Sequence, residues 1–135
     1  RRTLTPPPGR RVPIRTPADA ARVLLPVYAA RGSELFGVLL LDTKHRVLKT
    51  VVVAAGTLNR TIVEPRDVFR EAVLGSAAAV VLFHTHPSGD PQPSDDDDHL
   101  TRRLAAAGVL MGIDVVDHLV LGDVSYWSFK EMGRL

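Results

Sequence analysis

Hydrophobic residues fall in short runs along the chain, separated by polar or proline-rich segments. Two runs, 35–41 and 47–55, are rich in leucine and valine and are separated by a polar turn. Their length and β-branched content predict two buried strands, and a hairpin is the simplest connection. A third run at 77–83 predicts another buried strand. A strand near 113–121 and an edge strand at 124–129 complete the predicted sheet.

Three segments carry the signals of helices. Thr16-Pro17 offers an N-cap followed by proline at the first helical position, and the predicted helix runs to about residue 30, with Pro26 kinking or dividing it. A second helix begins at Glu64-Pro65 and presents one apolar face, formed by Val68, Phe69, Ala72 and Val73. A third helix begins at Ser94. The fold class is therefore α/β, with a single-domain mixed sheet flanked by helices.

The first 13 residues differ in composition from the rest of the chain. They are rich in arginine and proline, which is typical of a flexible arm or linker, and we expect the folded domain to span residues 14–135. With 45% hydrophobic residues, 135 residues can bury one core. Cysteine is absent and no apolar run approaches the ~20 residues of a membrane span, so we expect a soluble cytoplasmic protein. Because the sequence begins with Arg1 rather than methionine, we expect a fragment of a longer protein.

Two histidines, His84 and His86, follow the third predicted strand. Side chains at positions i and i+2 of a strand share a face, so both imidazoles should point in one direction and Thr85 in the other. A turn-rich loop at 87–93 then leads into the third predicted helix, which brings in Asp97. Two imidazoles and one carboxylate suit Zn²⁺ and leave a fourth tetrahedral position for water. We therefore predict one catalytic zinc ion per protomer.

A zinc hydrolase also needs a proton acceptor. The chain contains four glutamates, and Glu34 lies directly before the first predicted strand, from which its side chain could enter the same pocket. Glu34 is therefore the predicted general base. The Ser94-x-x-Asp97 spacing has a second explanation, because it also fits a capping box at the start of a helix. If the spacing is considered alone, the capping box is the favoured explanation. The same spacing occurs together with two histidines, Pro87 and Gly89 in one strand-loop-helix unit, and this combination favours a metal site.

The motif His84-x-His86-Pro87-x(6)-Ser94-x-x-Asp97, with Glu34 upstream, resembles the JAMM motif of the MPN+ metallopeptidases, whose members include deubiquitinating isopeptidases. More narrowly, the chain is similar to the RadC subfamily of bacteria at 84–94, 55–57, 63–69 and 117–122. The resemblance runs from about Ile14 to the C-terminus. It departs at Thr85, where RadC relatives typically carry asparagine. Because that side chain should face away from the metal, we expect little effect on metal binding.

The resemblance implies an MPN/JAMM-like domain that acts as a zinc metallopeptidase or isopeptidase on a polypeptide or isopeptide substrate. It implies that the zinc ligands are His84, His86 and Asp97. Glu34 would be the general base, and Ser94 would donate a hydrogen bond to the tetrahedral oxyanion.

The sequence leaves alternative functions open. The RadC name is associated with DNA repair, so one alternative is a repair-associated metal-dependent nuclease or a DNA-binding accessory domain. One zinc and one glutamate do not provide the two-metal clamp common in nucleases. A non-catalytic interaction module with the same fold is another alternative. Arginines 1, 2, 10, 11 and 15 could make weak nucleic-acid contacts through the basic arm, although the net charge is only +2.

His118 follows Asp117 in the predicted strand at 113–121. Our first interpretation is a satisfied core pair between these two side chains. The alternative is that His118 orients a metal ligand or faces the substrate, because metal ligands generally need outer partners.

Overall fold

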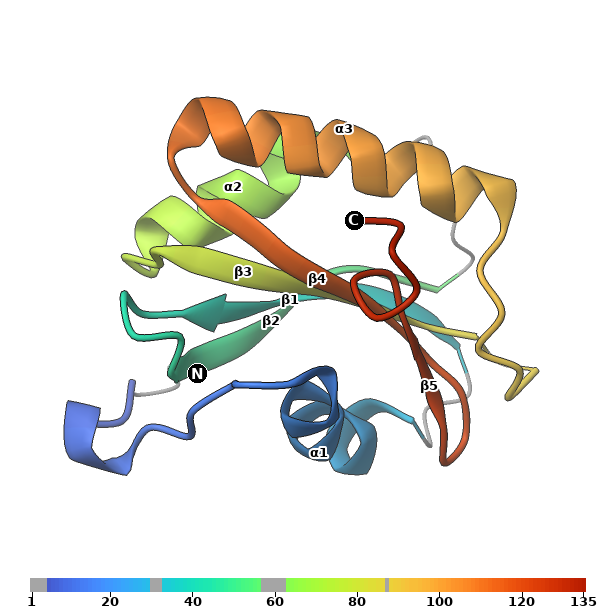
Figure 1. Ribbon diagram of the computed structural model, residues 1–135, viewed down its shortest axis with the longest axis horizontal. Helices are drawn as coiled ribbons and strands as arrows, with labels where there is room; N and C mark the ends of the chain where they lie inside the picture. The colour runs from blue at the N-terminus through green and yellow to red at the C-terminus, as the bar shows by residue number, and fades with distance from the viewer. Residues whose placement is uncertain (1–4, 30–32, 57–62, 87) are drawn as a thin grey trace.

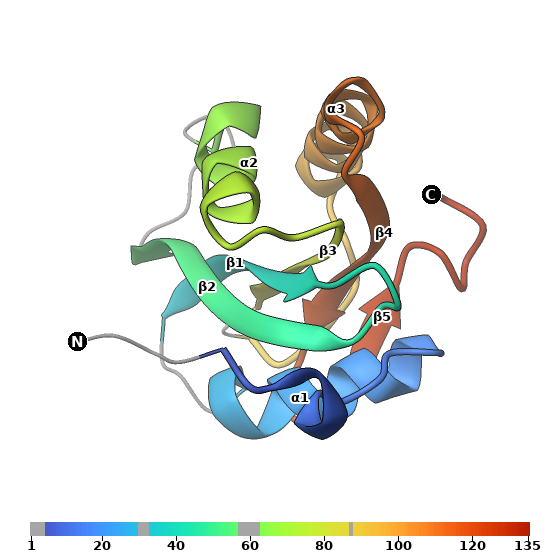
Figure 2. The same cartoon turned by 90° about the vertical axis from the view of Figure 1, so that its left-hand side faces the viewer.

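The computed structural model describes residues 5–29, 33–56, 63–86 and 88–135. A five-stranded mixed sheet lies between helices on its two faces (Figures 1 and 2). Helix α1 (Pro17–Tyr28) covers one face, and helices α2 (Pro65–Leu74) and α3 (Asp95–Met111) lie over the other. The predicted α/β class with a mixed sheet flanked by helices is confirmed.

The sheet has the strand order β2-β1-β3-β4-β5. Strand β1 pairs antiparallel with both β2 and β3, whereas β3 and β4 are parallel and are connected through α3. The predicted hairpin and edge strand are therefore present. The strand bounds are β1 Glu34–Leu41, β2 Val47–Gly56, β3 Ala79–Thr85, β4 Asp114–Leu121 and β5 Tyr126–Ser128.

Alternate residues of the central strands face opposite layers of the protein. In β3, Val81 and Phe83 pack in the core under α1, whereas Val80 and Leu82 pack in the core under α2 and α3. His84 continues the series of Val80 and Leu82, so it lies on the side of α2 and α3. All of these residues are at most 1% exposed. The metal motif therefore begins inside a packed core.

The predicted helix starts are confirmed. Thr16 caps α1 through a capping box with Asp19, and Pro26 lies inside that helix without ending it. Helix α2 starts at Pro65 as predicted. Val73 shares the apolar face with Phe69, but it is 56% exposed and lines the groove between α2 and α3.

The end of the arginine- and proline-rich segment is attached to the domain. A short 3-10 helix spans Pro8–Arg10, and Arg11 Nη1 then donates to Asp42 Oδ2 at 3.0 Å. Val47 N donates to Val12 O at 2.8 Å. Burial raises the pKa of Asp42, but its hydrogen bonds with the backbone N–H of Arg46 and with Arg11 outweigh this and lower it to about 2. Arg11 is therefore bound to a carboxylate of the β1–β2 turn.

Candidate metal centre

His84 and His86 lie at the end of β3, in the middle of the sheet. His84 is fully buried, and His86 continues the pairing with β4 because its N–H donates to Leu121 O at 3.0 Å. The two Nε2 atoms are 2.9 Å apart. As predicted, both imidazoles point to one side of the strand, and Thr85 bonds to the start of β1 instead.

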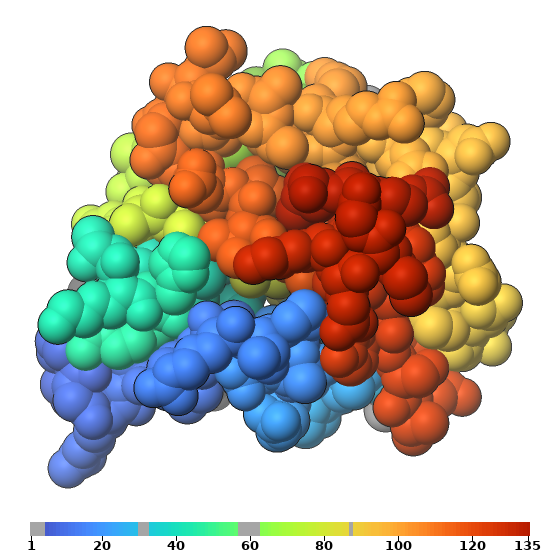
Figure 3. Space-filling view, in the orientation of Figure 1, coloured from blue at the N-terminus to red at the C-terminus, as the bar shows by residue number. Residues whose placement is uncertain are grey.

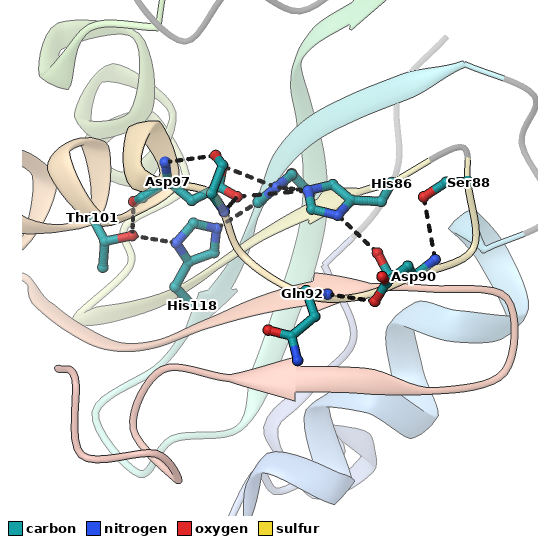
Figure 4. Close-up of polar contacts among 9 residues, drawn as sticks. His86, Ser88, Asp90, Gln92, Asp97, Thr101 and His118 are labelled. Carbon is teal, nitrogen blue, oxygen red and sulfur yellow. Dashed lines mark hydrogen bonds and ion pairs between the residues drawn. The ribbon is translucent and has the colours of Figure 1, made fainter.

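Asp97 reaches the histidines from the first turn of α3 (Figure 4). Its Oδ1 lies 3.2 Å from His84 Nε2, and its Oδ2 lies 3.6 Å from His86 Nε2. The same carboxylate accepts the Ser94 N–H at 2.7 Å, and Asp97 N donates to Ser94 Oγ at 3.2 Å. The capping box and the convergence with the histidines are therefore present together. The cap fixes the orientation of the carboxylate.

The chemistry of these atoms fits a bound cation. His86 Nδ1 lies 2.9 Å from the carbonyl oxygen of Asp90, which can only accept, so Nδ1 carries the proton and Nε2 presents its lone pair. That lone pair faces His84 Nε2 and the Asp97 carboxylate, and the ligand atoms of the three side chains lie within 4.8 Å of one another. A lone pair and a carboxylate oxygen at this distance repel unless a proton or a metal cation lies between them. His84, His86 and Asp97 thus form a group that could hold a metal ion.

The ionisation of Asp97 supports the same arrangement. Burial raises the pKa of its carboxyl, but interactions with the His84 and His86 imidazoles, when these are protonated, and with the Ser94 N–H outweigh burial. The pKa therefore falls well below its usual range. At neutral pH the group contributes a carboxylate.

The loop after His86 is held against the β4–β5 turn. Gly89 has φ +84, and a Cβ on Gly122 would lie 2.3 Å from Gly89 O. Only glycine at 122 permits this approach. Figure 3 shows this loop (yellow) beside the C-terminal segment (red). The contact places Asp90 O where it orients His86.

Glu34 is the first residue of β1, and its place follows from the strand pairing. Phe36 pairs with His84 across the β1–β3 ladder, and the two rings stack with centroids 6.0 Å apart. Because side chains two residues apart share a face, Glu34 lies on the same face of β1 as Phe36, one step nearer to His86. The structure therefore puts Glu34 on the histidine side of the sheet.

Thr85 connects β3 to the segment that carries Glu34. Its Oγ1 accepts the Leu35 N–H at 2.9 Å and donates to Ser33 O at 3.3 Å, so it bonds to the backbone on both sides of Glu34. The hydrophobic and polar pattern around Thr85 does not indicate this role. Asparagine also offers one acceptor and a donor, so it can make the same type of bridge.

If Glu34 is the general base of a hydrolase, Thr85→Val should lower hydrolysis about 10-fold or more without loss of metal, because the backbone on both sides of Glu34 loses its hydrogen bonds to Thr85. Thr85→Asn is the matched control and should retain activity. Rates of both variants, measured beside their metal content, check the expectation. Equal rates for wild type and Thr85→Val would contradict it.

His118 is placed differently from our first interpretation. Asp117 and His118 are neighbours on β4, so their side chains face opposite sides of the sheet and cannot form the expected core pair. Asp117 instead accepts from Ser128 Oγ at 2.6 Å and from backbone N–H groups, and burial raises its pKa. His118 Nε2 lies 2.9 Å from His84 Nδ1 (Figure 4). The alternative, a partner of a histidine in the metal group, fits this geometry.

None of the helices in the described ranges has the length and apolar character of a membrane span.

Comparison with known proteins places the chain in a family. Residues 14–134 match the RadC-like JAB domain. A UPF0758 protein of Trichlorobacter lovleyi is 55% identical over 102 residues, which are 76% of this chain and 44% of that protein. A UPF0758 protein of Methanosarcina mazei is 44% identical over 120 residues, or 89% of this chain and 52% of that protein.

The relative from Symbiobacterium thermophilum, also a UPF0758 protein, is 47% identical over 128 residues, covering 95% of this chain and 55% of that protein. The chain thus spans about half the length of these relatives, and their names state no activity. The family match covers both histidines, the aspartate and nearly all of the described fold. The chain belongs to the family of RadC-like JAB domains.

Proposed function

We propose that this domain is a zinc-dependent hydrolase that cleaves an amide or isopeptide bond in a polypeptide. The observation that carries the proposal is the convergence of His84 Nε2, His86 Nε2 and the Asp97 carboxylate at the end of β3. Two imidazoles and one carboxylate are a donor set typical of catalytic zinc sites with an open position. Membership of the JAB family supports a hydrolase.

A bound zinc ion would supply an electrophile for the substrate carbonyl and an acidified water as nucleophile. In this proposal Glu34 accepts the proton of the attacking water and returns it to the leaving amine. Its place on the histidine side of β1 supports the role. The bridge from Thr85 keeps its backbone fixed to β3.

Ser94 is proposed to stabilise charge on the substrate. Its Oγ accepts the Asp97 N–H in the capping box, and this bond does not use the hydroxyl proton. That proton can be donated to the carbonyl oxygen as negative charge develops there. The positive end of the α3 dipole lies at the same place and favours the same charge.

A nuclease or DNA-binding role is the second candidate, and it rests on the basic arm. The described part of the arm gives it little support, because Arg11 is paired with Asp42 and its side chain is only 17% exposed. Contacts by the remaining arm arginines would be to phosphates alone. Such binding is weak, salt-dependent and blind to sequence.

The experiment compares the full chain with a chain lacking residues 1–10, a deletion that spares Arg11. We expect zinc-dependent cleavage of peptide or isopeptide substrates to be unchanged by the deletion. Any DNA affinity should be weak, fall steeply with salt and be lost with the arm. Tight DNA binding that persists without the arm at high salt, together with zinc-dependent strand cleavage, would favour the nuclease.

A further inference from the structure

A buried chain of hydrogen bonds runs behind the proposed metal centre. It starts at the main-chain carbonyl of Asp97, to which Thr101 Oγ1 donates at 2.6 Å. Thr101 Oγ1 is 2.5 Å from His118 Nδ1, and His118 Nε2 is 2.9 Å from His84 Nδ1. The Thr101, His118 and His84 side chains are at most 1% exposed. Figure 4 shows Thr101 and His118 beside Asp97 on the side away from His86.

The direction of every bond in this chain follows from its first member. A carbonyl can only accept, so the single hydroxyl proton of Thr101 is committed to Asp97 O. Thr101 Oγ1 must then accept, so a neutral His118 ring carries its proton on Nδ1 and leaves Nε2 as an acceptor. His118 Nε2 in turn requires a proton on Nδ1 of His84. The Nε2 of His84 is left as the atom that faces Asp97 Oδ1.

Aromatic packing holds the middle of this chain in place. The His118 ring stacks on Phe129 with centroids 4.7 Å apart and an interplanar angle of 6°. The Phe36 ring contacts the His118 ring edge-on, with centroids 5.8 Å apart, and stacks on the His84 ring, with centroids 6.0 Å apart. Both phenylalanines are fully buried. Neither imidazole can rotate freely to exchange its nitrogens.

We propose that Thr101 and His118 are positioning residues that select the tautomer of His84 in which Nε2 can bind the metal. This inference rests on the proposed metal centre and adds that metal binding depends on two residues that are not ligands. The chain of hydrogen bonds begins at the backbone of Asp97 and ends at His84. The two elements that carry the centre, α3 and β3, are thereby tied together both at the metal group and behind it.

Thr101→Val tests the proposal with little change in shape. Valine gives His118 Nδ1 no acceptor, which removes the preference for that tautomer. His118 can then place its proton on Nε2, and His84 must place its own on the metal-binding nitrogen. We expect the zinc affinity of the full chain, measured by competition with a chelator, to fall about 10- to 100-fold. Thr101→Ser restores the hydroxyl and should bind zinc like wild type.

The positions of the ring protons can also be measured by NMR on the wild-type protein, so this test does not depend on whether a variant folds. In ¹⁵N-labelled metal-free protein, we expect the proton between the two rings to lie on His84 Nδ1, with a scalar coupling across the bond to His118 Nε2. A proton on His118 Nε2 would overturn the inference. So would zinc affinities equal to wild type in Thr101→Val. If wild type itself binds no zinc, the proposed function fails, and the ring tautomers still test the hydrogen-bond chain separately.

Discussion

Replacing Glu34 with glutamine is expected to abolish hydrolysis and leave zinc binding intact. Glutamine keeps the shape and polarity of the side chain but cannot accept a proton from water. General acid–base catalysis contributes on the order of 10²- to 10⁴-fold, so the rate should fall by at least that order. Peptide or isopeptide hydrolysis, measured beside zinc content on the same sample, checks both parts of the expectation.

Glu64→Gln is the matched control for this experiment. Glu64 lies at the start of α2, where it pairs with Arg103 at 2.9 Å, so its substitution should leave the rate unchanged. If Glu34→Gln turns over at the wild-type rate, another residue is the base. Loss of activity in Glu64→Gln alone would assign the role to Glu64.

Removing one member of the metal group is expected to remove most of the zinc. We expect about one zinc ion per wild-type protomer and nearly none in His84→Ala or Asp97→Ala, because two remaining protein ligands do not make a stable zinc site. Elemental analysis of metal-loaded, desalted samples gives the count. Hydrolysis should disappear together with the metal.

Two further variants separate metal binding from folding. Asp97→Asn keeps an oxygen that can accept the Ser94 N–H, so it retains the helix cap while losing the charge that a cation requires. It should fold like wild type and bind zinc weakly. His99→Ala removes an exposed histidine of the same helix and should change nothing. Unchanged zinc in both His84→Ala and Asp97→Ala would sink the ligand assignment.

The features predicted from the sequence are those that depend on local pattern. The period-two alternation placed His84 and His86 on one face, and the proline and N-cap signals placed the starts of α1 and α3. Ser94 and Asp97 form the capping box, and Asp97 also belongs to the metal group. Both roles are possible because the Asp97 carboxylate has two oxygens. Sequence spacing could not show that both uses coexist.

The features that were missed depend on packing between elements distant in sequence. Thr101 and His118 meet only because α3 packs across β4. Thr101 does carry a local signal, since a threonine four residues after Asp97 can donate to its carbonyl. Nothing in the sequence indicates that Thr85 bonds on both sides of Glu34. The adjacency of Asp117 and His118 suggested a pair, although strand geometry separates neighbours.

The most direct test is anomalous diffraction at the zinc absorption edge from crystals of the zinc-loaded chain. We predict one strong peak within bonding distance, about 2.0–2.2 Å, of His84 Nε2, His86 Nε2 and an oxygen of Asp97. A crystal of protein with full zinc content and no peak among these three side chains, or with its peak on other residues, would contradict the proposed metal centre.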